Sequence, residues 1–325
     1  METVVGLCQG LASGQCRRNL LISLFIIALQ VAVKVFRHHI DCTSKQDLRK
    51  FRRETAILAH LIHDNSVTLY GTTEGFGPTT ALVFRWFPDG TLFRLITEQG
   101  ATLTIRSKLK LLHGIASGLY YLHSFPVVHG GITSFNVLVD LKDGDYKACL
   151  TDFGLSNVLC AHLKERRIEG STVRAGAIRW AAPELFRPHD SLSDIKPTTQ
   201  NDMYSFGRVM FHLLTLIVPW HDIDEYKIVQ KIQKGEDIPR PEISDSTSDI
   251  TDARWNQIEQ CWSVDPAARP SAFMAMNFLK SELEALAADN DLSVFGLPSH
   301  AIEARVILSD LQYPNLRKPS FRRQV

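Results

Sequence analysis

The sequence lacks the features of a zinc protein, a disulfide-rich protein or a nucleic-acid-binding protein. Its six cysteines form no Cys-x-x-Cys pair, which argues against a zinc site and a disulfide framework. A net charge of +1 gives no bulk attraction to nucleic acids or membrane surfaces. There is no internal repeat and no low-complexity tract. We therefore expect a cytoplasmic globular protein, and 325 residues allow one large domain or two lobes.

No apolar run is long enough to cross a membrane by itself. Arg17 and Arg18 precede an apolar run over residues 20–29, and extending this run brings in Gln30 and Lys34. A basic pair before an apolar run is typical of a signal or anchor segment, but two buried strands would have the same composition. A third possibility is that residues 1–30 are not native to the domain, because no turn signal interrupts residues 20–36.

The first third of the chain mixes strand patterns with one helix pattern. The predicted strands cover residues 31–36, 67–70 and 81–86. The predicted helix covers residues 46–62, and the residues that share its apolar face are Phe51, Thr55, Leu58 and Ile62. Pro88-Asp89-Gly90 is a turn signal that ends this part of the chain.

The rest of the chain is mostly helical in pattern. Apolar residues recur at helical spacing from Ile105 to Leu119, with Thr104 as the expected N-cap. Short strands are predicted over 137–139 and 147–150, and a long surface loop over 155–180. Further predicted helices cover residues 204–216, 226–234, 255–262 and 272–287. The tail, from 288 onward, is expected to be a loosely docked extension.

Two motifs carry the strongest signal. His129 and Asn136 stand at the spacing of a His-Arg-Asp-x-x-x-x-Asn loop, and Asp152-Phe153-Gly154 follows an apolar strand. Together with Val31-Ala32-Val33-Lys34 and Ala182-Pro183-Glu184, in this order, they resemble the protein kinase family. The resemblance covers about residues 28–285, and Cys261-Trp262 ahead of Asp265-Pro266 is similar to its tyrosine-kinase-like group.

The resemblance implies an α+β fold of two lobes. A small N-terminal lobe, with an antiparallel sheet and one helix, would reach to about residue 87. A larger, mainly helical lobe would start at about residue 91. Residues 1–27 would then be an N-terminal segment of uncertain role, and residues 286–325 a C-terminal tail.

The resemblance also implies a nucleotide site that binds ATP with Mg²⁺. Lys34 would contact the phosphates and pair with Glu54. The backbone of the segment joining the lobes would bind the adenine edge, with Phe84 as the gatekeeper ring. The residues expected around the nucleotide are Lys34, Ala32, Phe84, Arg85, Trp86, Phe87 and Leu138, and the expected metal ligands are Asn136 and Asp152.

Three further residues would have structural roles in this family. Glu184 would form a buried ion pair with Arg269, and Asp202 would accept hydrogen bonds from the backbone of the catalytic loop. These roles do not depend on phosphate transfer, and they would persist in an inactive member.

The sequence departs from the family pattern at the catalytic residues. Gly131 replaces the aspartate that accepts the proton of the substrate hydroxyl. Thr133 replaces a lysine that contacts the γ-phosphate, and Ala177 replaces a threonine that often hydrogen-bonds both. Gly130 replaces the loop arginine. The full glycine-rich pattern is missing: one interpretation is a degraded loop of Gly10 and Gly14 with Cys16 at the valine position, and the alternative is that this segment is not native to the domain.

Three functional hypotheses follow. The first is a pseudokinase or very weak phosphotransferase that still binds ATP–Mg²⁺, because Gly131 cannot act as the base. The second is an active kinase for Ser, Thr or Tyr with an unorthodox site. The third is a membrane-tethered receptor-like fragment, for which the residues before 30 are the only support. Protein substrates or signalling partners are expected; nucleic acid and membrane partners are not.

Overall fold

The computed structural model describes residues 30–35, 55–76, 80–153, 177–186, 197–242 and 249–294. The expected anchor segment, the remnant of the glycine-rich loop, Glu54 and the end of the tail lie outside these residues. The chain divides into two compact units, residues 1–280 and 281–325. The first unit contains every element described below except the C-terminal part of helix α8.

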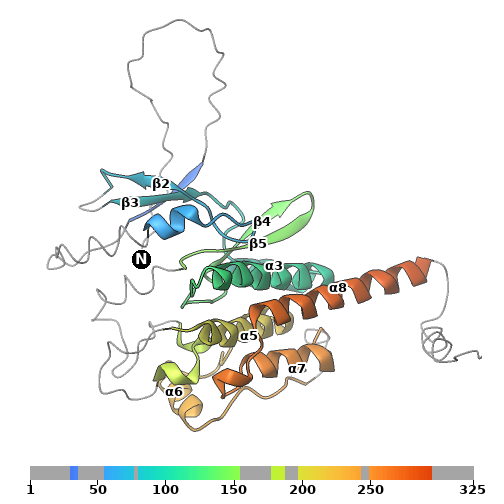
Figure 1. Ribbon diagram of the computed structural model, residues 1–325. Helices are drawn as coiled ribbons and strands as arrows, with labels where there is room; N and C mark the ends of the chain where they lie inside the picture. Colours follow the sequence, from blue (N-terminus) through green and yellow to red (C-terminus); the bar gives the residue numbers. More distant parts are fainter. Residues whose placement is uncertain are drawn as a thin grey trace, which may run out of the picture. The chain divides into compact units, whose positions relative to one another are not determined.

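The small sheet has three antiparallel strands in the order β1-β3-β2. These are β1 (Val31–Lys34), β2 (Leu69–Thr73) and β3 (Ala81–Arg85). Strand β2 begins two residues later than predicted, because Val67 donates its N–H to Leu150 O at 2.9 Å instead of pairing in the sheet. Strand β3 pairs antiparallel with both β1 and β2, so the predicted antiparallel sheet is confirmed (Figure 1).

The helix before β2 is described only at its C-terminal end, over residues 55–60. Leu58 is buried as predicted. The prediction for Ile62 was wrong: it lies beyond the helix and its side chain is 71% exposed. The apolar spacing continued past the helix end, so periodicity alone placed Ile62 on the buried face.

The larger part of the first unit begins with two helices. Helix α2 (Leu92–Gln99) was not predicted; the Thr91 side chain caps it by accepting from Arg94 N. Helix α3 (Ile105–Ser124) starts as predicted, with the Thr104 side chain accepting from Ser107 N. A 3₁₀ turn, η1 (Gly100–Thr102), lies between them.

A hairpin of β4 (Val137–Lys142) and β5 (Asp145–Leu150) follows, and β5 packs against α3. Its turn residues Asp143 and Gly144 both have positive φ, which Gly and Asp tolerate better than other residues. Both short strands were predicted at these positions, although each extends further than the sequence pattern indicated.

Helix α5 (Thr199–Thr215) is the centre of the helical part, and every residue from Asn201 to Thr215 is buried. It begins five residues before the predicted start, because a capping box of Thr198 and Asn201 supports polar residues at its N-terminus. It packs against α3 and α7, and a Cβ at Gly207 would lie only 2.7 Å from Cys261 Cβ. The glycine therefore permits the close approach of α5 and α7.

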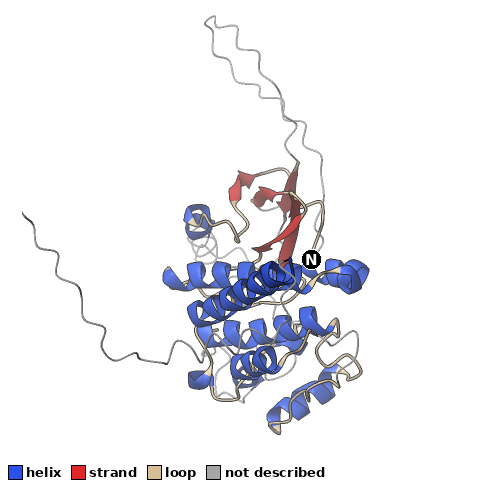
Figure 2. Cartoon of the chain, turned by 90° about the vertical axis from the view of Figure 1, so that its right-hand side faces the viewer, coloured by secondary structure: helices blue, strands red, loops and turns tan. Residues whose placement is uncertain are grey.

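The remaining helices occur near their predicted positions. They are α6 (Glu225–Gln233), α7 (Asp252–Cys261) and α8 (Ala272–Val294). Short 3₁₀ turns are η3 (Ile178–Trp180), η4 (Pro183–Phe186) and η5 (Pro266–Ala268). Helix α8 runs seven residues beyond its predicted end at 287. Figure 2 shows the small sheet at one end of the first unit and the large helices at the other, the two-lobed fold expected from the sequence.

No helix among the described residues combines the length and the apolar character needed to span a bilayer.

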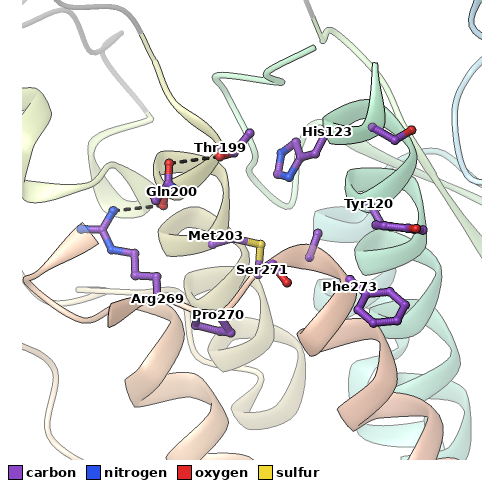
Figure 3. A pocket seen from close by; sticks show the side chains of 11 residues that line it. Tyr120, His123, Thr199, Gln200, Met203, Arg269, Pro270, Ser271 and Phe273 are labelled. Atoms are coloured by element: carbon purple, nitrogen blue, oxygen red, sulfur yellow. Dashed lines mark hydrogen bonds between the residues drawn. The ribbon is translucent and has the colours of Figure 1, made fainter. Parts of the chain in front are cut away.

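The predicted ion pair between Glu184 and Arg269 is confirmed. The two residues form a bidentate pair, with Arg269 Nη1 2.7 Å from Glu184 Oε1 and Nη2 2.9 Å from Oε2. Arg269 also donates to Gln200 O, where it lines a pocket between α3, α5 and the start of α8 (Figure 3). Because the Arg269 side chain is fully buried, water cannot stabilise its positive charge, and these partners do so instead.

Replacing Arg269 with methionine should lower the free energy of unfolding by about 3–5 kcal/mol, since Glu184 would lose its partner in a mostly buried position. Urea denaturation measures this change. Arg94→Met is the matched control, because Arg94 and Glu98 form an exposed pair that should matter far less. Equal effects of the two substitutions would contradict the structural role of Arg269.

Candidate active site

The loop that follows α3 is held by one buried carboxylate. Asp202 accepts from His129 N through Oδ2 and from Gly130 N through Oδ1, both at 2.8 Å. His123 Nε2 lies 2.9 Å from Oδ2 as well. The predicted role of Asp202 is therefore confirmed. The contact of His123 was not predicted, because nothing in the sequence around it points to residue 202.

The interior of the loop is closed by Asn136. Its Nδ2 donates to Gly131 O at 2.7 Å, and its backbone N–H donates to Thr133 O at 3.0 Å. This hydrogen bond fixes the orientation of the Asn136 amide. Its oxygen, Oδ1, has lone pairs and is the atom suited to a cation. The loop thus keeps its shape although residue 131 has no side chain.

Gly130 has a structural reason to be glycine. Its φ is 70°, in the left-handed region that side chains disfavour. Gly131 is not among the glycines with positive φ. The backbone conformation therefore favours glycine at position 130. At position 131 the backbone conformation would also allow a residue with a side chain.

Lys34 and Asp152 meet as a direct ion pair. Burial opposes ionisation of Asp152, but the nearby Lys34 ammonium outweighs it and holds the pKa of the carboxyl below its ordinary value. Asp152 has a φ of 67°, a conformation that aspartate tolerates better than most residues. The predicted pair of Lys34 with Glu54 stays a prediction, because Glu54 lies outside the described residues.

His129 and Phe153 lie behind this pair. The His129 ring is fully buried, and its centroid is 6.1 Å from that of Phe153 in an edge-on arrangement. Burial lowers the pKa of His129, so the ring is held in its neutral form. The ring therefore packs on Phe153 as a neutral group.

The residues expected around the nucleotide converge at the junction of the sheet and the β4–β5 hairpin. Ala32 is the partner of Phe84 in the sheet, and Phe84 and Leu138 pack on a cluster of Val67, Phe87 and Cys149. Burial raises the pKa of the Cys149 thiol to about 11, so this cysteine is an inert part of the core.

The segment that joins the two parts is fixed along β4. The Arg85 guanidinium donates to Asp140 Oδ2 at 2.8 Å and lies 4.9 Å from the centre of the Phe87 ring. Val139 N donates to Gly90 O, and Trp86 N donates to Gln30 O in the sheet. The Trp86 N–H is therefore already hydrogen-bonded within the protein. The pairing of Arg85 with Asp140 was not predicted.

The two other replaced residues serve the core in this structure. Thr133 is buried, and its carbonyl accepts from Asn136 N. Ala177 packs against an apolar cluster that includes Ile178, Trp220 and Ile228 of helix α6. Neither side chain carries a charge that could meet a phosphate.

Ser134 is tied to α5 by a buried hydrogen bond. Its Oγ lies 2.8 Å from His212 Nδ1, and the His212 ring also contacts Phe93 and Trp180. Burial lowers the pKa of His212 to about 4, so the ring is neutral at physiological pH. No sequence pattern indicated this bond, because it joins residues 78 positions apart.

A comparison with protein families matches most of the chain. The model of the family described as protein tyrosine and serine/threonine kinase matches residues 26–279. This span includes the catalytic loop, the Lys34–Asp152 pair and the Glu184–Arg269 pair.

Curated proteins with similar sequences carry kinase names. Serine/threonine-protein kinase CTR1 of Arabidopsis thaliana is 33% identical over 77% of this chain and 28% of its own length. Dual specificity protein kinase splA of Dictyostelium discoideum is 31% identical over 85% of the chain and 11% of its length. Serine/threonine-protein kinase TNNI3K of Mus musculus is 32% identical over 64% and 22%. The chain thus spans less than a third of each relative.

The buried neutral His212 predicts a specific loss of stability in acid. Between pH 6.5 and about 4 the unfolded ring takes up a proton that the folded ring does not. Stability should therefore fall as the pH drops through this window, by about 1.4 kcal/mol for each pH unit from this residue.

Urea denaturation at pH 7 and pH 5 measures this loss. His212→Gln should be less stable at pH 7, because it perturbs the bond with Ser134, but should lose less on acidification. His221→Gln, which changes an exposed histidine, should keep the wild-type dependence. A wild-type slope in His212→Gln would show that His212 is not held neutral.

Proposed function

The chain belongs to the protein tyrosine and serine/threonine kinase family, and from this membership we propose that it binds ATP with Mg²⁺ but transfers phosphate very slowly or not at all. The observation that carries the proposal is the contrast within one loop. Asp202 and Asn136 hold the loop in a closed shape, yet residue 131 has no carboxylate to place in it.

The residues present fit a magnesium nucleotide. Mg²⁺ prefers oxygen ligands and is usually held by one or two carboxylates together with phosphate oxygens and water. Asp152 would supply the carboxylate and Asn136 its amide oxygen. The described residues contain no group of three or more His, Cys, Asp or Glu side chains suited to a metal, so phosphate oxygens would complete the coordination.

Lys34 would change partner when a nucleotide binds. In the structure its ammonium neutralises Asp152, and both side chains are largely shielded from water. In the proposed complex Asp152 would hold the metal, and Lys34 would contact the phosphates. The Lys34 ammonium therefore matches the negative phosphates of ATP–Mg²⁺, and the Asp152 carboxylate matches its positive metal ion.

The chemistry that remains is limited by two missing groups. Bound ATP–Mg²⁺ would supply a phosphoryl group, but Gly131 cannot take the proton of an attacking hydroxyl. Loss of a general base typically slows a reaction by about 10²–10⁴-fold. Thr133 adds no positive charge near the transferred group, which removes a further source of transition-state stabilisation.

An active kinase with an unorthodox site is the second candidate. Its support is the intact scaffold, since the Glu184–Arg269 and Asp202 contacts are all present, and the kinase names of the relatives. In either case the family supports a protein as the partner or substrate, and we propose a role in signalling.

We expect ATP–Mg²⁺ to raise the midpoint of thermal unfolding by several degrees. A ligand at about 100 times its Kd stabilises the folded state by about 2.7 kcal/mol. Asp152→Asn should abolish the part that depends on Mg²⁺, because it removes the proposed metal ligand. Asp145→Asn, which changes an exposed carboxylate at the start of β5, should keep it. No magnesium-dependent rise in the wild type would overturn the binding proposal.

Transfer of labelled γ-phosphate tests the catalytic half. The wild type should show no transfer above Asp152→Asn, whereas Gly131→Asp should show clear transfer, because a general base typically contributes about 10²–10⁴-fold. The double variant Gly131→Asp/Asp152→Asn should again be inactive. Wild-type transfer that Asp152→Asn abolishes would favour the active-kinase candidate instead. A Gly131→Asp variant without any gain would show that the site is not organised for transfer.

A further inference from the structure

The helical part of the first unit contains a pocket that is separate from the proposed nucleotide site. It lies between the C-terminal end of α3 and the starts of α5 and α8, and its volume is about 540 Å³. Pockets that bind drug-sized molecules have volumes of about 300–1,000 Å³. The described residues that line this pocket include none of those proposed to hold ATP–Mg²⁺. The pocket therefore has room for a small molecule of its own.

The floor of the pocket is apolar. Met203, Pro270 and Ala272 line it, and all three side chains are buried in the fold. A polar group of a ligand placed over these side chains would lose its water without gaining a hydrogen bond. This part of the pocket therefore favours the apolar part of a ligand.

Two aromatic rings form one wall of the pocket (Figure 3). Tyr120 of α3 and Phe273 of α8 contact each other, with ring centroids 5.3 Å apart and planes tilted by 45°. The two residues are 44% and 47% exposed, so much of their surface remains in water. A flat aromatic ligand would cover part of this surface and would gain a ring–ring contact as well as apolar burial.

The pocket offers no free charge to a ligand. Among the described residues that line it there is no aspartate, glutamate or lysine, and Arg269 is the one with a permanent charge. Its guanidinium is fully buried and pairs with both oxygens of Glu184, and its other hydrogen bonds go to Gln200 O and Ser263 O. A charged ligand would find no partner of opposite sign here, so the lining favours a neutral one.

His123 provides one polar atom for a ligand. Its Nε2 lies 2.9 Å from Asp202 Oδ2, and because an ionised carboxylate only accepts hydrogen bonds, Nε2 is the donor. In the part of the chain that the structure describes, the His123 side chain forms no second hydrogen bond. The ring lines the pocket, so in its neutral form Nδ1 is an acceptor for an N–H or O–H group of a ligand.

We propose that this pocket binds a small neutral aromatic molecule that carries an N–H or O–H donor. The ring system of the ligand packs against Tyr120 and Phe273 above Met203, and its donor binds His123 Nδ1. The inference goes beyond the proposed function and does not depend on it, since the pocket and the proposed nucleotide site share no described residue.

The test titrates the full chain with indole and measures binding by saturation-transfer NMR. The wild type should bind indole, and Tyr120→Ala should weaken binding about tenfold, because it removes half of the aromatic wall. Phe273→Ala should have a similar effect, and it serves as a second variant in case Tyr120→Ala does not fold. Phe125→Ala is the matched control, because Phe125 is an exposed ring directly after α3 that does not line the pocket.

Two isomers of methylindole test the hydrogen bond to His123. The wild type should bind 3-methylindole, which keeps the N–H, about fivefold more tightly than 1-methylindole, which lacks it. Equal affinities would overturn the role of His123 Nδ1. The site itself is overturned if the wild type binds no indole, if neither Tyr120→Ala nor Phe273→Ala weakens binding, or if Phe125→Ala weakens it as much. Thermal unfolding of each variant shows that it is folded.

Discussion

The structure of the site depends on the buried carboxylate of Asp202. It lies near the start of α5, within a helix whose residues are almost all buried, and accepts backbone hydrogen bonds from two successive residues of the loop. A carboxylate out of water must have its lone pairs satisfied, and His129, Gly130 and His123 do this. The loop is therefore anchored to the core of the helical part, whatever stands at position 131.

Because of this anchoring, the shape of the loop does not depend on the residue that would carry out the chemistry. The contacts that fix the loop use backbone groups and the side chains of Asp202 and Asn136, and none needs a side chain at residue 131. The glycine at position 131 is therefore compatible with the fold. A protein under this constraint can keep a nucleotide site while phosphate transfer decays, which is the combination we propose.

The accuracy of the sequence predictions varied with the range of the interactions involved. The start of helix α3 and the positions of strands β4 and β5 follow from local patterns and were predicted, although the strands are longer than predicted and their pairing was not foreseen. Helix α2 was missed because its pattern is only eight residues long, and α5 was started late because its first turn is polar. Ile62 was placed on the buried face because periodicity does not show where a helix ends.

The sequence alone determined the family and the residue types at its motif positions, including a glycine at position 131, because these depend on residue type and spacing along the chain. Only the tertiary structure decided which groups meet. Lys34 pairs with Asp152 across 118 positions, Ser134 binds His212, and Phe135 stacks on Phe93 at the surface. Such contacts join distant segments through packing, and no local pattern of apolar or charged residues encodes their distances.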